Sequence, residues 1–357
     1  MSKVHNFSAG PCILPKEVLE EASQSVLNFN NLDLSILEIS HRSKDIIDVV
    51  SEAESLVKEL LNVPDGYKVV FLQGGASLGF LMTAYNYMKL DGEAAYINTG
   101  TWSTKAIEAA RGFGEVKVIG SSEDRNFTYI PKGLGVPMSA NYLHYTSNNT
   151  IFGTQFHKVP VVRCPLICDM SSDIFSREID VHLYDLIYAG AQKNMGPAGS
   201  TVYIVKESGL GKTKRDIPVM LDLQTHIKNE SMYNTPPVYS IYVSLLTMRW
   251  IKKQGGVAEM GRRNEAKAHL LYHEIDHNPL FYGTVEDLDR SSMNATFKLH
   301  DESLSEEFNK MCADARIDGI KGHRSVGGYR ASMYNALPIE SVQALVDVMK
   351  EFAAKKG

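Results

Sequence analysis

The stretch Leu186-Ile-Tyr-Ala-Gly-Ala-Gln-Lys-Asn-Met-Gly-Pro-Ala-Gly-Ser-Thr-Val-Tyr-Ile-Val-Lys206 decides the fold class of this 357-residue chain. An apolar run of four residues opens the stretch and breaks at Gly190, and a β-branched run at residues 201–205 closes it. Small residues, two further glycines and a proline fill the middle. The pattern predicts a strand, a tight irregular turn that carries Lys193, and a second strand. Taken alone, the turn fits either a solvated loop lysine or a lysine packed closely enough to react with a carbonyl compound.

Strands and helices alternate upstream of this stretch. Apolar runs predict strands at residues 68–72, 94–98, 116–119, 142–145, 161–168, 186–189 and 201–205. Helical spacing predicts helices at residues 17–30, 43–61, 76–88 and 102–110. Ser43 suits the N-cap of the second helix. The apolar side chains expected to face inward from that helix are Ile46, Ile47, Val50, Ala53, Leu56, Val57 and Leu60. This order indicates an α/β fold with a mainly parallel seven-stranded sheet that helices cover on both faces.

The order of predicted helices and strands changes near residue 256. Helices are expected at 238–253 and 257–277, and after Pro279 the spacing favours a smaller α+β unit. Its expected elements are strands at 293–299 and 329–334 and helices at 305–315 and 339–353. We therefore predict a large domain at residues 16–256 and a small domain made of residues 1–15 and 257–357.

Composition excludes several classes of protein. Hydrophobic residues make up 44% and charged residues 22% of the chain, and the net charge is -5 without a long block of one sign. This balance is typical of a globular protein and lacks the basic footprint of a nucleic-acid or membrane-surface binder. No apolar stretch is long enough to span a bilayer, and the spacing of the four cysteines suits neither a disulfide framework nor a zinc site. We expect a cytoplasmic protein that binds no metal.

Two short motifs indicate a ligand site at the sheet edge. Gly74-Gly-Ala-Ser77 follows a predicted strand and opens a helix, an arrangement that suits a phosphate, although a plain turn would look much the same. Asp169 ends another predicted strand, where ligands of open α/β sheets gather, although it could also cap a turn with the serines that follow it. A carboxylate there could pair with a protonated ring nitrogen, as a pyridoxal cofactor requires.

Together these residues resemble the class V, fold-type-I pyridoxal-phosphate (PLP) aminotransferases, and among them the phosphoserine aminotransferase family. The resemblance covers nearly the full length. The motifs that carry it are Phe7-Ser-Ala-Gly-Pro11, His41-Arg42, Ala189-Gly-Ala-Gln-Lys-Asn-Met-Gly-Pro-Ala-Gly199, Asn234-Thr-Pro-Pro237 and His323-Arg-Ser-Val-Gly-Gly-Tyr-Arg-Ala-Ser332.

The resemblance implies the role of each site residue. Lys193 would form the Schiff base with PLP, Asp169 would pair with the pyridine nitrogen, and Trp102 would stack on the ring. The remaining cofactor contacts would be Ala76, Ser77 and Gln192 to the phosphate, Thr150 to the ring hydroxyl, and Asn234 and Thr235 to the cofactor phosphate of a neighbouring subunit. A homodimer with shared sites follows. Some family members carry arginine where Ser77 stands, so substrate-phosphate binding cannot simply be copied from them.

Charge suggests a substrate with two anionic ends. Three short cationic clusters, His41-Arg42, His323-Arg324 and Arg330, lie in polar or glycine-rich surroundings, although each alone fits an exposed pair. Arg330 would clamp the α-carboxylate and the other four residues would meet a phosphate. Ser8, in the first motif, is a further candidate for substrate binding.

The reaction that the resemblance implies is reversible transamination of 3-phosphooxypyruvate with L-glutamate, which gives O-phospho-L-serine and 2-oxoglutarate in L-serine biosynthesis. It leaves open whether 3-hydroxy-2-oxo-4-phosphooxybutanoate of pyridoxine biosynthesis is also used. The alternatives are another class V enzyme such as an alanine–glyoxylate aminotransferase or a cysteine desulfurase, a non-catalytic binding protein that kept the fold, and a nucleotide-binding α/β protein.

Overall fold

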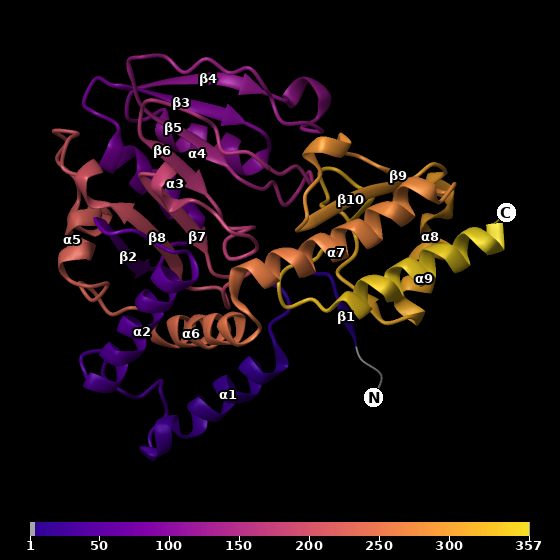
Figure 1. The fold of residues 1–357 in the computed structure, drawn as a ribbon, viewed down its shortest axis with the longest axis horizontal. Coiled ribbons are helices and arrows are strands. Elements are labelled where there is room, and N and C mark those ends of the chain that lie inside the picture. The colour runs from indigo at the N-terminus through magenta and orange to yellow at the C-terminus, as the bar shows by residue number, and fades with distance from the viewer. Residues whose placement is uncertain (1–3, 357) are drawn as a thin grey trace.

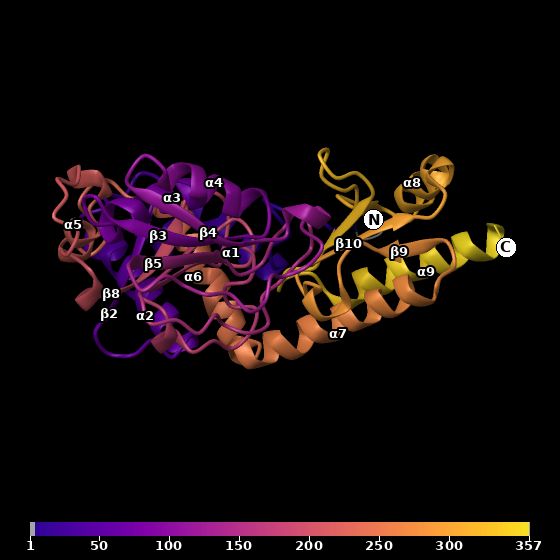
Figure 2. The same ribbon diagram turned by 90° about the horizontal axis from the view of Figure 1, so that it is seen from above.

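The computed structural model describes residues 4–356. Residues 1–3 and 357, which belong to the predicted small domain, lie outside the described residues. Figure 1 shows an α/β body built from the first two thirds of the chain and a smaller unit built from the last third. Helix α7 (Gly256–His277) starts at the body and runs along the smaller unit, as the view from above also shows (Figure 2).

Within residues 4–356, seven strands form the central sheet and five others lie outside it. The central strands are β2 (Tyr67–Leu72), β3 (Glu93–Asn98), β4 (Glu115–Ser121), β5 (Ala140–Thr146), β6 (Leu166–Asp169), β7 (Leu186–Gly190) and β8 (Thr201–Lys206). The others are β1 (His5–Asn6), β9 (Phe281–Gly283), β10 (Asn294–Leu299), β11 (Ile317–Asp318) and β12 (Tyr329–Ser332). The helices besides α7 are α1 (Lys16–Leu27), α2 (Lys44–Leu60), α3 (Gly75–Tyr87), α4 (Thr101–Ala110), α5 (Leu223–Lys228), α6 (Val238–Lys253), α8 (Ser305–Asp314) and α9 (Ile339–Lys356).

The central sheet has the strand order β2-β8-β7-β6-β5-β3-β4. β8 runs opposite to the other six strands of this sheet, because it returns directly from β7 through the turn that carries Lys193. The carboxyl ends of β2, β6 and β7 therefore meet at one edge, where α/β proteins place their ligands. The predicted fold class, a mainly parallel seven-stranded sheet between helices, is confirmed.

Alternation along the strands divides the core into two layers. Ile97 and Leu143 belong to a buried cluster that also contains side chains of α2 and α6. Tyr96 and Tyr142 point the other way, into a cluster with side chains of α3 and α4. Both faces of a parallel sheet must be covered, and this sandwich meets that need.

The smaller unit has a core of its own. Strands β12, β10 and β9 form an antiparallel sheet, and α7, α8 and α9 contribute to the cluster that packs with it. Phe7, which is fully buried, belongs to the same cluster, and β1 pairs in parallel with β11. The N-terminal arm thus lies beside the C-terminal unit (Figure 1).

Two local expectations are wrong. The predicted strand at residues 161–168 begins only at Leu166, and Val161 is fully exposed. Pro165 has no N–H to donate to a ladder, so the apolar residues before it do not continue the strand. Ile47, expected to face inward from α2, is 45% exposed, and Val49 is buried instead. The N-cap prediction is confirmed, because the side chain of Ser43 accepts a hydrogen bond from the Ile46 N–H.

Candidate active site

Lys193 lies in the turn between β7 and β8, with only 8% of its surface exposed. Its Nζ donates hydrogen bonds to Thr150 Oγ1 (2.6 Å) and Ser172 Oγ (2.8 Å), and these two hydroxyl oxygens are 2.7 Å apart. The solvated-loop interpretation of this lysine is therefore wrong. The fold holds its amine inside the protein.

Burial lowers the pKa of Lys193 from 10.5 to about 8, and the positive charge of Arg330 acts in the same direction. The carboxylate of Asp169 opposes both effects by favouring the charged amine. A lysine near this pKa has a substantial neutral fraction at physiological pH. The neutral amine is the form that attacks a carbonyl carbon or accepts a proton.

Asp169 ends β6 at the same sheet edge, with 4% of its surface exposed. Its Oδ1 accepts two hydrogen bonds from Ser171, one from the backbone N–H (2.9 Å) and one from the hydroxyl (2.6 Å). Among the described residues no hydrogen bond or ion pair uses Oδ2. Burial raises the pKa of this carboxyl, against the hydrogen bonds from Ser171 and the charge of Lys193. A cationic partner at Oδ2 would favour the ionised form.

The Gly74 turn brings the N-terminus of α3 to this edge. Gly74 is the N-cap residue at φ 98°, a left-handed conformation that glycine adopts without strain. No hydrogen bond among residues 4–356 uses the backbone N–H groups of Gly75, Ala76 and Ser77. Farther along α3, a Cβ on Gly79 would lie 2.6 Å from the Tyr188 ring, so the helix packs closely on β7. Free N–H groups at a helix N-terminus form an anion site.

These elements surround a cavity of about 330 Å³. Its walls include seven of the predicted cofactor residues and two of the predicted substrate residues: Ala76, Ser77, Trp102, Thr150, Asp169, Gln192, Lys193, His323 and Arg330. Arg330 comes from β12 and donates to the Thr150 carbonyl (3.3 Å), while its buried Nε has no partner in the described part of the chain. Burial lowers the pKa of His323, as do the charges of Arg330 and Arg324.

Six predicted residues do not line this cavity. Asn234 and Thr235 lie next to Gln73, whose Nε2 donates to the Thr235 carbonyl (2.7 Å). His41 and Arg42 precede α2, and Arg42 is exposed. The other two are Arg324, which is exposed, and Ser8, whose N–H donates to Asn6 Oδ1 (2.9 Å).

The structure adds residues for which no site role was predicted. Ser172 contacts the Lys193 amine directly, and Ser171 orients Asp169. Asn194 donates to the Ser172 carbonyl (2.9 Å) and accepts from the Asn335 N–H (2.9 Å), which joins the lysine turn to the loop after β12. The serines could have been found as the polar pair that follows Asp169. The Asn194 to Asn335 bond, 141 residues apart, leaves no local signal.

The cavity fits PLP chemically. A phosphate needs donors, and the free N–H groups of α3 supply them. A protonated pyridine nitrogen needs an acceptor, and Asp169 Oδ2 is free. An aldehyde needs a neutral amine, and burial prepares that of Lys193. The volume lies near the lower end of the range for small-molecule sites.

Comparison with known proteins agrees with this geometry. The family model described as aminotransferase class-V matches residues 4–345. The phosphoserine aminotransferase of Flavobacterium psychrophilum is 61% identical over 354 residues, which cover 99% of each chain.

Two solved structures extend the comparison. The phosphoserine aminotransferase of Bacillus circulans subsp. alkalophilus has a TM-score of 0.96 at 44% identity and covers 99% of both chains. The PLP-bound phosphoserine aminotransferase of Trichomonas vaginalis has a TM-score of 0.93 at 36% identity, and the match covers 98% of this chain and 100% of the other. The chain therefore belongs to the aminotransferase class V family, and within it to the phosphoserine aminotransferases.

Proposed function

We propose that the protein is a PLP-dependent phosphoserine aminotransferase, which transfers the amino group of L-glutamate to 3-phosphooxypyruvate and forms O-phospho-L-serine for L-serine biosynthesis. The observation that carries the proposal is the placement of Lys193 and Asp169 in one cavity, together with a relative that is 61% identical over 99% of the chain. A cysteine desulfurase finds no support at this site. The Cys12 thiol donates to the Lys193 carbonyl (2.8 Å), and burial raises its pKa to about 12.

When bound, PLP supplies an aldehyde that condenses with amines and a ring that stabilises negative charge on the substrate α-carbon. Lys193 Nζ accepts the proton from that carbon in its neutral form and returns it as an acid later in the reaction. Thr150 and Ser172 hold the amine at the cavity wall. A pKa of about 8 places both protonation states within reach near neutrality.

Asp169 keeps the cofactor ring protonated through its free oxygen. Ser171 fixes the other oxygen with two hydrogen bonds, so the carboxylate needs no reorganisation during the reaction. Trp102 lines the cavity, and its ring stacks on the cofactor ring in this proposal. The N–H groups of Ala76 and Ser77 and the side chain of Gln192 anchor the cofactor phosphate.

Arg330 binds the α-carboxylate that all substrates share, and its unpartnered Nε supplies a donor for it. His323, in the same wall, and Arg324 beside it meet the substrate phosphate. His41, Arg42 and Ser8 complete the predicted anion contacts.

Transamination of O-phospho-L-serine with 2-oxoglutarate tests the substrate, with L-alanine and L-serine as matched amino donors that lack the phosphate. Arg330→Ala should reduce activity with glutamate and phosphoserine alike. His323→Ala should raise the KM for phosphoserine more than that for glutamate. Equal losses for both substrates in both variants would contradict this division of roles, and activity with alanine above that with phosphoserine would refute the substrate class.

The protein acts as a homodimer in this proposal, because several anion-binding residues lie outside the cavity of their own chain. Asn234 and Thr235 then serve the cofactor phosphate of the partner's site, and His41 and Arg42 its substrate. The residue groups 16–256 and 1–15 with 257–357 act as the two domains around the cavity. All four cysteines are unpaired, which suits the reducing cytoplasm.

Mixed dimers test the sharing of sites. Lys193→Ala and Arg42→Ala chains are unfolded together and refolded, then assayed with phosphoserine. If each site combines Lys193 of one chain with Arg42 of the other, every mixed dimer holds one intact site, and random pairing restores about a quarter of the wild-type rate. Refolded single variants are the controls. No recovery beyond them would show that each chain builds its own site.

A further inference from the structure

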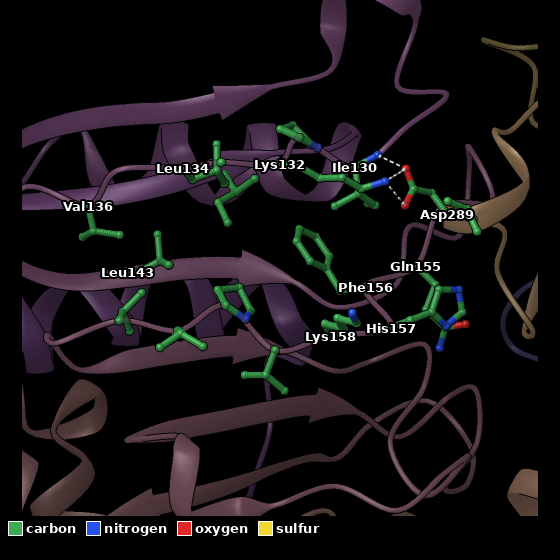
Figure 3. Close-up of a pocket in the computed structure, with 18 residues that line it drawn as sticks. Ile130, Lys132, Leu134, Val136, Leu143, Gln155, Phe156, His157, Lys158 and Asp289 are labelled. Atoms are coloured by element: carbon green, nitrogen blue, oxygen red, sulfur yellow. Dashed lines mark hydrogen bonds and ion pairs between the residues drawn. The ribbon is translucent and has the colours of Figure 1, made fainter.

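A second cavity, of about 600 Å³, lies against β3 and β5, and Lys193 is not among the residues that line it (Figure 3). Its floor includes Ile97 of β3 and Leu143 of β5, which are 0% and 1% exposed. Helix α2 packs on β2 at the other end of the sheet. Loops at residues 130–136 and 155–162 cover this half instead, and they leave the cavity between them.

Apolar side chains line most of the cavity and continue to its rim. Phe156 projects between the two loops, with Leu134 and Val136 on the facing side (Figure 3). At the rim, the side chains of Val161 and Leu288 are 100% and 81% exposed. Apolar side chains that gather at a concave site in this way indicate a ligand that covers them.

Polar groups gather at one end only. Figure 3 shows Lys132, Asp289, His157 and Lys158 at the end of the cavity opposite Val136. Lys132 is paired with Asp289 (3.1 Å), whose Oδ2 also accepts from the Ile130 N–H (2.9 Å). Lys158 is exposed and has no ion pair or side-chain hydrogen bond within the described part of the chain. Lys132 and the Ile130 N–H thus satisfy the carboxylate of Asp289, and the amine of Lys158 remains available to a ligand.

We propose that this cavity is a binding site for a small amphipathic carboxylate, with an apolar ring or chain lying over Ile97 and Leu143 and its carboxylate turned toward Lys158. The volume suits a ligand of that kind, since small-molecule sites measure about 300–1,000 Å³ and combine apolar walls with a few polar groups. The site is separate from the transamination site, because the two cavities share no lining residue.

A fluorescence titration of the PLP-loaded protein with 1-anilinonaphthalene-8-sulfonate tests the site, followed by displacement with decanoate. Bound PLP keeps this probe out of the transamination site. Val136→Trp, which fills the cavity, should abolish saturable binding. Leu288→Glu, at a position that is 81% exposed, should weaken binding at least about tenfold, because it removes apolar contact and adds a charge of the same sign as the ligand. Leu90→Glu, at a leucine elsewhere that is 61% exposed, is the matched control.

The anionic end has its own test. Lys158→Ala should raise the Kd of decanoate by about two- to fivefold, as for an exposed ion pair, whereas Lys228→Ala on α5 should leave it unchanged. Absence of saturable binding, or equal binding to wild type, Val136→Trp and Leu288→Glu, would overturn the site. If Lys158→Ala and Lys228→Ala bind decanoate alike, the assignment of the carboxylate to Lys158 is wrong.

Discussion

The buried amine of Lys193 should destabilise the protein when PLP is absent. Its pKa is about 8 in the folded chain against an ordinary value of 10.5, a difference of about 2.5 units. At about 1.4 kcal/mol per unit, protonating this amine inside the fold costs about 3 kcal/mol of unfolding free energy. Lys193→Met removes that cost and keeps the side-chain length. Thr150 and Ser172 stay partnered, because their hydroxyl groups bond each other at 2.7 Å.

The pH dependence follows from the direction of the shift. Since the pKa is lower in the folded chain, the unfolded chain binds the extra proton between pH 8 and 10.5, and wild-type stability rises with pH in that window. The advantage of Lys193→Met is therefore complete below pH 8. It falls to about 2 kcal/mol at pH 9 and disappears above pH 10.5.

Urea unfolding of the PLP-free proteins, at one fixed protein concentration, measures this difference at pH 7 and pH 9. Lys228→Met, at an exposed lysine on α5, is the control and should change the unfolding free energy by less than about 0.5 kcal/mol at both values. A Lys193→Met advantage that is absent, or that is the same at both pH values, would refute the reasoning.

Three further predictions concern the site and the packing of α3, the helix whose N-terminus reaches it. Asp169→Asn should lower kcat at least about a hundredfold while PLP stays bound. A transamination assay measures kcat and absorbance measures bound PLP. A smaller loss would show that the reaction does not depend on the charge of Asp169. Gly79→Ala should lower the unfolding free energy by about 1–3 kcal/mol, because its Cβ meets the Tyr188 ring at 2.6 Å, and an unchanged urea midpoint would contradict that packing. The rate at which PLP reloads the free protein should rise about tenfold from pH 7 to pH 9, as the Lys193 amine loses its proton. Stopped-flow absorbance measures this rate, and a rate that does not change with pH would contradict the prediction.

Much of the fold could be predicted because periodicity reports burial. The strands that flank Lys193 are buried on both faces and so read as continuous apolar runs. The same rule failed at residues 161–165, where Val161 and Val162 line a cavity and form no strand. An apolar run indicates that side chains avoid water and does not by itself show a strand. Pro165, which has no N–H to donate, was the local sign that β6 begins only after it.

The site could be predicted only where a residue's role is tied to a local pattern. Asp169 follows its strand directly, and the glycines of the α3 turn mark an anion site. Arg330 is different, because it reaches Thr150 across 180 residues, and only the packing of β12 against the body brings the two together. The sequence motif around Arg330 predicted its role in substrate binding. That its charge also lowers the pKa of Lys193 could be seen only from the structure.

For His41 and Arg42, the role that the sequence suggested and the position that the structure gives differ most. Their sequence context suggested an anion site, yet in their own chain they precede α2 and contribute nothing to the wall around Lys193. Arg330 lines the cavity for the carboxylate, whereas of the four residues predicted to meet the phosphate only His323 lines it. The predicted phosphate contacts are therefore incomplete within one chain. Either these residues are ordinary surface cations, or the two-fold symmetry of a dimer places them in the partner's cavity. The mixed-dimer experiment separates the two cases. A chain that lacks Lys193 can restore its partner's site only if its own Arg42 enters that site, and a surface cation does not.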